Sequence, residues 1–219
     1  MLPEIAYQKF IIKINKNAQT NNIACDKGRF VLIYNESQNK EIEYILEKRA
    51  NDSIRYIQKL LVPSKLLKSK KKDKSFDLFT LPEDFFDFST LFGMATKECC
   101  KEVSLDMYEI KSENENLVTF DEFQKPSFEF REAPYYISQD SIKAFKDDFE
   151  YNGLHLTYYR YPKQISLKNP ENPESNFSKQ EIELDDKIVD RIISRASAEF
   201  EMNNSNPKYQ VDLQRTIQK

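Results

Sequence analysis

The sequence predicts an α+β fold, with a helical part at the N-terminus, a β-rich middle that contains an antiparallel hairpin, and helices at the C-terminus. Three observations lead to this prediction. Apolar residues recur with helical spacing in residues 7–14, an Asn-Gly pair at 152–153 separates two alternating segments, and apolar residues recur every four positions in 184–200. The 219 residues are enough to bury a hydrophobic core in one domain or in two small ones.

Residues 1–64 are predicted to form a helical subdomain. The apolar spacing of residues 7–14 predicts its first helix. A second pattern runs over residues 28–46, although its early part, 29–34, could instead form a strand, because a short apolar run does not distinguish the two. Residues 51–61 begin with N-cap candidates and then carry apolar residues at helical spacing, so they predict a third helix.

The next residues, 65–75, are predicted to be a Lys-rich linker. Residues 65–74 hold six lysines against one aspartate. Two interpretations stay open: a solvated surface loop between two packed parts, or a phosphate-binding patch at Lys68–Lys74, since lysine neutralises backbone charge without reading sequence. No aromatic residue lies among these lysines, which argues against a stacking platform for single strands.

Residues 76–88 are dense in phenylalanine and acidic residues. Pro82 and the two carboxylates after it are suited to start a helix, because carboxylates favour the positive end of the helix dipole. The apolar face of that helix would consist of Phe85, Phe88, Leu91, Phe92 and Ala95. The simple interpretation is a core helix. Alternatively some rings contact another subunit, and Phe85, Phe86 and Phe88 are the candidates.

Residues 127–132 alternate apolar with charged side chains, which is the pattern of a half-exposed strand. Two flanking prolines favour a position at the edge of a sheet. A free edge suits strand addition between subunits. Phe128, Phe130 and Arg131 are therefore candidates for pairing with a neighbour.

The Asn152-Gly153 pair is the clearest local signal in the chain. Between two alternating segments it predicts a two-residue hairpin turn, because both central positions of such a turn need positive φ. Tyr159 and Tyr161 would then lie on the opposite face of the second strand from Tyr158. Tyrosines on both faces indicate a strand that meets a second surface, so Tyr159 and Tyr161 are further interface candidates.

The predicted connector domain, residues 76–219, ends with a long loop and helices. Prolines and asparagines mark the loop 163–178, and loops of that length are usually functional or mobile. Apolar spacing predicts a helix over 184–200 and a short one at 209–217. Removing 163–178, or reversing the charge at Arg131, is expected to impair assembly more than folding.

The sequence contains few residues suited to catalysis. It has one histidine, His155, and three glycines, and it lacks the common phosphate-loop, dinucleotide, zinc and EF-hand motifs. Clusters of carboxylates at 83–87, 121–122 and 147–148 are either solvated faces or a metal site of the kind that nucleases use. No catalytic residue, metal ligand or cofactor is nominated, and composition favours a scaffold or binding role over an enzyme.

Charge and cysteine usage predict a soluble protein of a reducing compartment. The net charge of -3 creates no field that would draw the chain to DNA or to a membrane. The N-terminus lacks the layout of a signal peptide, and no apolar run approaches the length of a membrane span. Three cysteines, an odd number, fit a reducing cytosol best.

Several segments together resemble one family. They are Leu81–Phe88, Pro126–Glu132, Tyr158–Pro162 leading to Ile165, Glu181–Asp186 with the helix that follows, and Asn206–Tyr209. Over residues 76–219 this pattern resembles the neck proteins of tailed bacteriophages, in particular the ring proteins of crAss-like phages. The N-terminal helical part departs from small head–tail adaptors.

The resemblance implies a virion structural protein without catalysis. Such a protein forms a homo-oligomeric ring, commonly twelve-fold, between the portal and the tail, and it is assembled in the host cytoplasm. Its partners would be copies of itself, the portal, other neck or tail proteins, and double-stranded DNA passing through the lumen without sequence-specific binding. Two alternatives stay open: a nucleic-acid-processing enzyme with a carboxylate metal site, and an intracellular interaction module that forms no ring.

Overall fold

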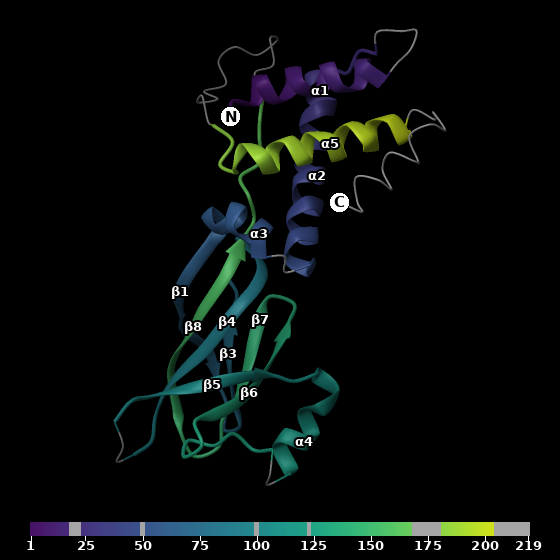
Figure 1. Ribbon diagram of the computed structural model, residues 1–219. Coiled ribbons are helices and arrows are strands. Elements are labelled where there is room, and N and C mark those ends of the chain that lie inside the picture. The colour runs from purple at the N-terminus through teal and green to yellow at the C-terminus, as the bar shows by residue number, and fades with distance from the viewer. Residues whose placement is uncertain (18–22, 49–50, 99–100, 122–123, 168–180, 204–219) are drawn as a thin grey trace. The chain divides into compact units, whose positions relative to one another are not determined.

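A computed structural model describes residues 1–17, 23–48, 51–98, 101–121, 124–167 and 181–203 (Figure 1). It confirms the α+β class, with helices at the N-terminus, a mostly antiparallel sheet in the middle and a helix at the C-terminus. The chain divides into two compact units, residues 1–60 with 161–219, and residues 61–160. We call them the helical unit and the sheet unit. The sheet unit is an insertion in the sequence of the helical unit.

The two units do not follow the predicted boundaries, which placed a linker at residues 65–75. The C-terminal helix belongs to the same unit as the N-terminal helices, because its apolar side packs on theirs. The Lys-rich segment is part of the sheet, since residues 61–67 and 69–72 are strands. The contacts that join the first and last helices span most of the chain, and local sequence patterns do not report such contacts.

In its described residues, the helical unit contains three long helices and two short helical segments. They are α1 (Pro3–Asn17), α2 (Lys27–Lys48), α3 (Asn51–Ile54), the 3-10 helix η1 (Arg55–Leu60) and α5 (Asp186–Asn203). The helices predicted at 7–14, 28–46 and 184–200 are confirmed, and the strand alternative for 29–34 is wrong. The third predicted helix is shorter than expected, because a strand begins at Leu61. The short helix predicted at 209–217 lies outside the described residues.

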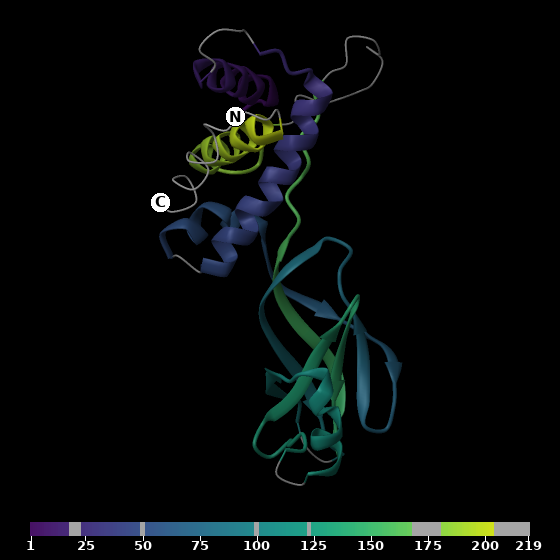
Figure 2. The same ribbon diagram turned by 90° about the vertical axis from the view of Figure 1, so that its right-hand side faces the viewer.

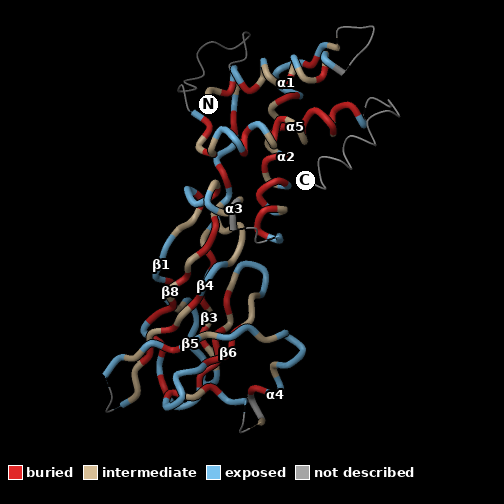
Figure 3. Tube along the Cα trace, viewed as in Figure 1, coloured by how far each residue is buried: buried red, intermediate tan, exposed pale blue. Residues whose placement is uncertain are grey.

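Aromatic rings form the core of the helical unit, whose helices turn their buried sides toward one another (Figure 3). The ring centroid of Phe10 in α1 lies 5.0 Å from that of Phe30 in α2 and 5.7 Å from that of Phe200 in α5. Phe30 and Tyr34 are four residues apart and both fully buried, as one face of a helix requires. The distant helix α5 therefore shares one core with the two N-terminal helices.

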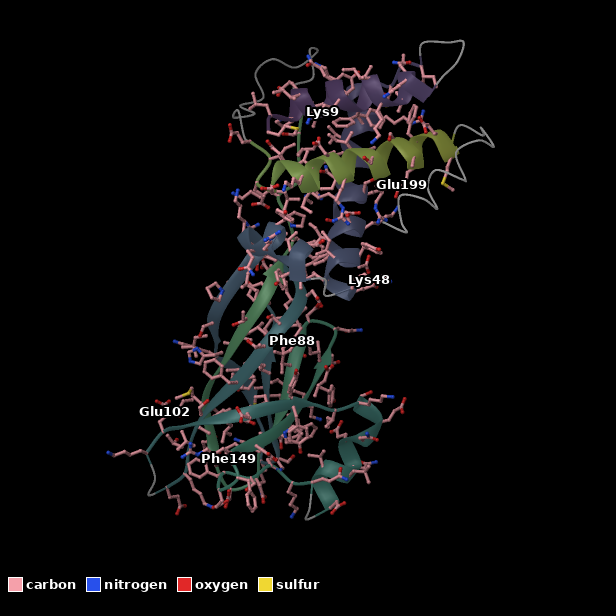
Figure 4. The ribbon with its side chains drawn as sticks, viewed as in Figure 1. Lys9, Lys48, Phe88, Glu102, Phe149 and Glu199 are labelled. Atoms are coloured by element: carbon pink, nitrogen blue, oxygen red, sulfur yellow. The ribbon has the colours of Figure 1, made fainter. Side chains whose placement is uncertain are left out.

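Polar contacts add to this packing between α2 and α5. Glu41 of α2 is 4% exposed, and its two carboxylate oxygens lie 2.7 Å from Arg191 and 3.0 Å from Arg195 of α5. Burying one carboxylate against two guanidinium groups fixes the register of the two helices, since an unpaired charge at this depth would be costly. Lys9 of α1 and Glu199 of α5, both labelled in Figure 4, make further ion pairs in this unit.

The sheet unit contains eight strands and one short α-helix among its described residues. The strands are β1 (Leu61–Leu67), β2 (Ser69–Lys72), β3 (Phe76–Thr80), β4 (Phe85–Thr96), β5 (Val103–Glu109), β6 (Glu132–Ser138), β7 (Ser141–Phe145) and β8 (Glu150–Arg160). The 3-10 helix η2 (Ser112–Asn114) and α4 (Glu115–Phe120) lie between β5 and β6. The order is β1-β8-β4-β5-β6-β7-β3-β2, and β5–β6 is the one parallel pair among these strands.

This sheet is rolled so that its two ends meet (Figure 2). β1 and β2 stand at opposite ends of the strand order, yet only Lys68 separates them in the chain. Consecutive Cα atoms lie about 3.8 Å apart, so the last residue of β1 and the first residue of β2 are close together. The chain pairs with β8 before Lys68 and with β3 after it. The interior is filled by a core that includes Phe79, Leu105 and Leu154.

The predicted Phe-rich helix is wrong, because residues 85–96 form the long strand β4. Irregularities in its pairing with β8 occur between Phe85 and Asp87 and between Phe88 and Thr90. Each bulge inserts one residue and lets the next side chain face the same way. Phe85, Phe88 and Leu91 therefore all contact the core at intervals of three, which imitates the spacing of a helix.

The predicted Asn-Gly hairpin is also wrong, because Asn152 and Gly153 lie inside the continuous strand β8. The pairing of β4 with β8 is irregular at this point, so Asn152 sits in a bulge. A Cβ on Gly153 would lie 2.6 Å from Cδ1 of Leu66 and 3.1 Å from the carbonyl oxygen of Leu67. The glycine is required here by the close approach of β1, not by a turn.

The described helices do not include one that is both long enough and apolar enough to cross a bilayer.

Candidate interaction surfaces

A tight turn stands where the edge strand 127–132 was predicted, so that prediction is wrong. Ser127 and Glu132 exchange two backbone hydrogen bonds, of 2.9 and 3.1 Å, and the chain between them reverses. The hydroxyl of Ser127 accepts a hydrogen bond from the N–H of Phe130, and Arg131 has a φ of 58°. This left-handed conformation ends the alternation that the side-chain pattern suggested.

The turn separates its two aromatic residues. Phe128 is 8% exposed and belongs to the core of the rolled sheet, with its ring 6.1 Å from that of Phe149. Phe130 is 82% exposed. Phe128 therefore anchors the turn, while Phe130 is held in solvent as a protruding apolar side chain. We call residues 127–132 the Phe130 turn.

Ion pairs hold the base of this turn. Nζ of Lys97 lies 2.6 Å from a carboxylate oxygen of Glu129 and also contacts Asp148. Hydrogen bonds to Asp148 and Glu129 hold the pKa of Lys97 above its usual range, and the hydrogen bond from Lys97 lowers the pKa of Glu129. Lys97 thus ties the Phe130 turn to the segment before β8.

The candidate phenylalanines of β4 lie mainly against the core. Phe85 and Phe88 are half-buried, with their rings 5.7 Å from Tyr158 and 5.9 Å from Tyr135. Phe88 and Phe149 are both labelled in Figure 4, along the rolled sheet. Phe86, at the bulge, is also half-buried. A role of these three phenylalanines in a subunit contact stays a prediction. Phe85 and Phe88 do pack against the core of the sheet unit.

Tyr159 and Tyr161 differ in exposure. Tyr159 is 8% exposed and lies on the face of β8 opposite Tyr158, and burial raises its pKa, as does Asp87. Tyr158 faces the core and donates a hydrogen bond to Asp84, while burial and that carboxylate raise its pKa to about 12. Tyr161 belongs to the helical unit and is 48% exposed.

The outer face of the sheet unit carries one continuous row across five strands. Its members are register partners: Leu66 of β1, His155 of β8, Phe92 of β4, Asp106 of β5 and Glu132 of β6. The rings of Phe92 and His155 are stacked, 4.7 Å apart and 3° from parallel. Nδ1 of His155 lies 3.0 Å from the hydroxyl of Ser64. The histidine therefore contributes a ring contact and a hydrogen bond to the sheet.

The two carboxylates of this row stand beside an exposed aromatic ring. Asp106 and Glu132 are both exposed, and Tyr108 of β5 is 40% exposed on the same side. Burial raises the pKa of Tyr108, and the charge of Glu132 raises it further. We call Asp106, Glu132, Tyr108 and Phe92 the acidic face. Sequence reasoning missed it, although the alternation of residues 103–108 was a signal for a strand with this outer side.

The Lys-rich segment runs from the end of β1 through β2, and β2 forms an ordered hairpin with β3. The N–H of Asp73 donates to the carbonyl of Phe76 in its turn, and β2 pairs with β3. The five lysines from Lys68 to Lys74 are all exposed, as is Lys65 near the end of β1. We call residues 68–80 the lysine hairpin. Whether Lys68–Lys74 bind nucleic acid stays a prediction.

A buried ion cluster secures the lysine hairpin to its neighbours. Asp77 of β3 is fully buried, and its carboxylate lies 3.1 Å from Nζ of Lys146, which also lies 2.8 Å from Glu150. Lys72 lies 3.6 Å from Glu150. Burial raises the pKa of Asp77 against the opposing effect of Lys146, and the hydrogen bond from Lys146 lowers the pKa of Glu150.

The start of the predicted loop 163–178 packs on the helical unit. The side-chain amide of Asn35 donates to the carbonyl of Ile165 and accepts from its N–H, and Ile165 is buried. Residues 168–178 lie outside the described residues. Because Ile165 packs on the helical unit, we expect removal of the whole loop 163–178 to disturb folding. The expectation that this deletion impairs mainly assembly is therefore corrected for residues 163–167.

A groove of about 560 Å³ runs along α1 in the helical unit. Tyr7, Ile11 and Ile12 line it with Cys25, and Ile12 is 67% exposed. Burial raises the pKa of the Cys25 thiol, which describes a structural rather than a reactive cysteine. Cys99 and Cys100 lie outside the described residues.

Among the described residues, no three His, Cys, Asp or Glu side chains converge as metal ligands would. Comparison of the sequence with protein-family models and with the curated proteins found no match.

Proposed function

We propose that this chain is a virion structural protein, one subunit of an oligomeric ring in the neck of a tailed phage. The ring, for which the resemblance implies twelve copies, joins the portal to the tail and leaves a channel for genome DNA. The observation that carries the proposal is the Phe130 turn. A hydrogen-bonded turn holds an 82% exposed phenylalanine in solvent, where it is available as an aromatic anchor for another protein.

Exposed apolar side chains on both units support this proposal. Leu32 of α2 and Ile12 of α1 are 66% and 67% exposed, and Leu66 of β1 is 50% exposed. A ring subunit contacts a neighbour on each side through two different surfaces, because head-to-tail contacts must close. The resemblance of the segments in residues 76–219 to phage neck proteins supports the proposal that these surfaces act in a virion.

The test is incorporation of variants into phage particles. Phe130→Asp changes an exposed side chain, so it is expected to fold normally and to lower the amount of this chain in purified particles at least tenfold. Leu117→Asp on α4 is the matched control, because Leu117 is 49% exposed in the same unit. Quantitative mass spectrometry of the particles measures both.

Two outcomes would overturn the proposal. One is that the wild-type chain is absent from purified particles. The other is a metal-dependent nuclease activity that alanine substitution in one carboxylate cluster abolishes, which would favour the enzyme alternative.

A further inference from the structure

Charge is distributed very unevenly within the sheet unit. Within the lysine hairpin, residues 68–74 hold five lysines and one aspartate, whereas the rest of residues 61–160 holds nine basic and eighteen acidic residues. One hairpin is therefore strongly positive, and the unit that carries it is strongly negative. Two copies of such a unit attract each other when the hairpin of one approaches the body of the other.

The lysine hairpin presents its charges to a partner. Lys68, Lys70, Lys71 and Lys74 are exposed. Within the described part of the chain, Lys72 is the lysine of this hairpin with an ion pair, at 3.6 Å from Glu150. The buried Asp77–Lys146 pair beneath it holds the hairpin in place. The positive charges thus stand on a fixed element rather than on a loose linker.

The acidic face has the chemistry that lysine side chains need. Asp106 and Glu132 are register partners on β5 and β6, which brings two exposed carboxylates together. Phe92 and Tyr108 flank them with aromatic rings. Carboxylates pair with ammonium groups, and aromatic faces attract both the cation and the aliphatic stem of lysine.

The strand order puts these two surfaces on opposite sides of the rolled sheet. Going round from β2, the strands β3, β7 and β6 come before β5. Going the other way from β1, the strands β8 and β4 come before β5. In Figure 1, β5 crosses the front of the sheet unit while β3 runs behind it. A surface and its complement on opposite sides of one unit is the arrangement that a head-to-tail contact requires.

We propose that the lysine hairpin of one copy binds the acidic face of the next copy. This contact repeats from copy to copy and closes into a ring if the rotation between copies allows it. This proposal deepens the proposed neck function, and only the closed ring rests on that function. The contact itself rests on the charges and the strand order.

Two other roles for the lysines predict different behaviour. Lysines on the edge strand β2 also discourage pairing with foreign strands, and that role needs no acidic partner. Binding of DNA phosphates would use the same ammonium groups, but the surplus of acidic residues on the rest of the unit repels a polyanion. A second copy of the chain offers an acidic face to the lysine hairpin and a lysine hairpin to the acidic face.

The experiment uses two complementary variants of the full chain. The first is Lys70→Glu with Lys71→Glu, and the second is Asp106→Lys with Glu132→Lys. A control with the same change in charge as the first carries Lys27→Glu and Lys59→Glu on exposed positions of the helical unit. Sedimentation velocity at low salt measures self-association, and carbodiimide cross-linking of isotope-mixed copies identifies the residues that meet.

The wild type and the control are expected to associate, and more weakly in high salt, because screening shortens the range of these charges. Each variant alone is expected to associate at least about tenfold more weakly, since like charges then face each other. A mixture of the two variants is expected to restore association, because each keeps one native surface and offers a reversed partner for the other.

Three results would overturn the inference. They are a wild type that stays monomeric and uncross-linked at low salt and high concentration, a mixture that associates no better than its components, and variants that associate like the wild type. If the hairpin variant instead loses affinity for a DNA duplex while self-association is unchanged, the lysines bind nucleic acid and the inference is wrong. Particles that contain the chain in a ring without this contact would leave the neck function standing and remove this inference alone.

Discussion

At the scale of single residues, Gly153 shows why a strong local signal failed. Asn-Gly usually marks a hairpin turn, yet here the glycine lets β1 approach β8 closely, and the pair lies within a strand. A turn and a close backbone approach both favour glycine. The sequence alone therefore predicted a turn, whereas the need for glycine here comes from Leu66 and Leu67 of another strand.

Gly153→Ala is expected to destabilise the protein by about 1–3 kcal/mol, because the added methyl overlaps Leu66. Leu66→Ala in the same chain is expected to recover part of the loss, since Leu66 is half exposed and its Cδ1 makes the closest contact. The carbonyl of Leu67 would keep the recovery incomplete. Urea unfolding of the single and double variants measures this, and a Gly153→Ala protein as stable as the wild type would contradict it.

The buried pair of Asp77 and Lys146 leads to a second prediction at this scale. Lys146→Met leaves a fully buried carboxylate without its cation and is expected to cost about 3–5 kcal/mol near neutral pH. The double variant Asp77→Leu with Lys146→Met is expected to recover most of that loss, because a buried ion pair contributes little over packed apolar groups. Denaturant unfolding of both variants provides the test.

This penalty is expected to depend on pH. Burial raises the pKa of Asp77 in the folded state, and loss of Lys146 removes the effect that opposes the shift. A carboxyl with a raised folded pKa loses stability as pH rises from its unfolded pKa through its folded pKa. The cost of Lys146→Met relative to the wild type should therefore shrink as pH falls toward the ordinary pKa of aspartate. A cost that stays constant over this range would show that the buried charge is not its cause.

At the scale of elements, regular helices were predictable and irregular strands were not. The stripes that define α1, α2 and α5 are continuous, so their spacing identified them. The bulges in β4 shift its phase twice and produce a helix-like interval. The Lys-rich segment has hardly any apolar residues, and it is a strand because β3 pairs with it.

The two phenylalanines of the Phe130 turn, Phe128 and Phe130, are expected to contribute very differently to stability. Phe128→Ala is expected to cost about 3–5 kcal/mol, because Phe128 belongs to the core. Phe130→Ala is expected to change stability by about 0.5 kcal/mol or less, because its side chain is in solvent. Chemical denaturation measures both changes. Equal costs at the two positions would mean that Phe130 packs within its own chain and is not available to a partner.

At the scale of the whole molecule, the sheet unit is an insertion between two parts of the helical unit. Its first residue, Leu61, is a register partner of Tyr159, so the chain enters and leaves the rolled sheet at adjacent points. This division is not visible in the sequence, because it depends on which helices pack together. The same holds for the acidic face, whose carboxylates come from β5 and β6 on either side of α4.

Residues 61–160 are expected to fold when expressed alone. They contain a core of their own, and about 100 residues suffice for an independent domain. Cooperative thermal unfolding and a dispersed amide NMR spectrum of this fragment would bear out the expectation. A fragment without a cooperative transition would show that the helical unit is needed for its stability.

An electron cryo-microscopy reconstruction of the neck in purified phage particles that contain this chain would show directly whether it forms the proposed ring. We expect copies of the chain in a ring between portal and tail, around a central channel, with Phe130 at a contact with another protein. Particles whose neck is complete without this chain, or in which Phe130 faces open solvent on every copy, would contradict it.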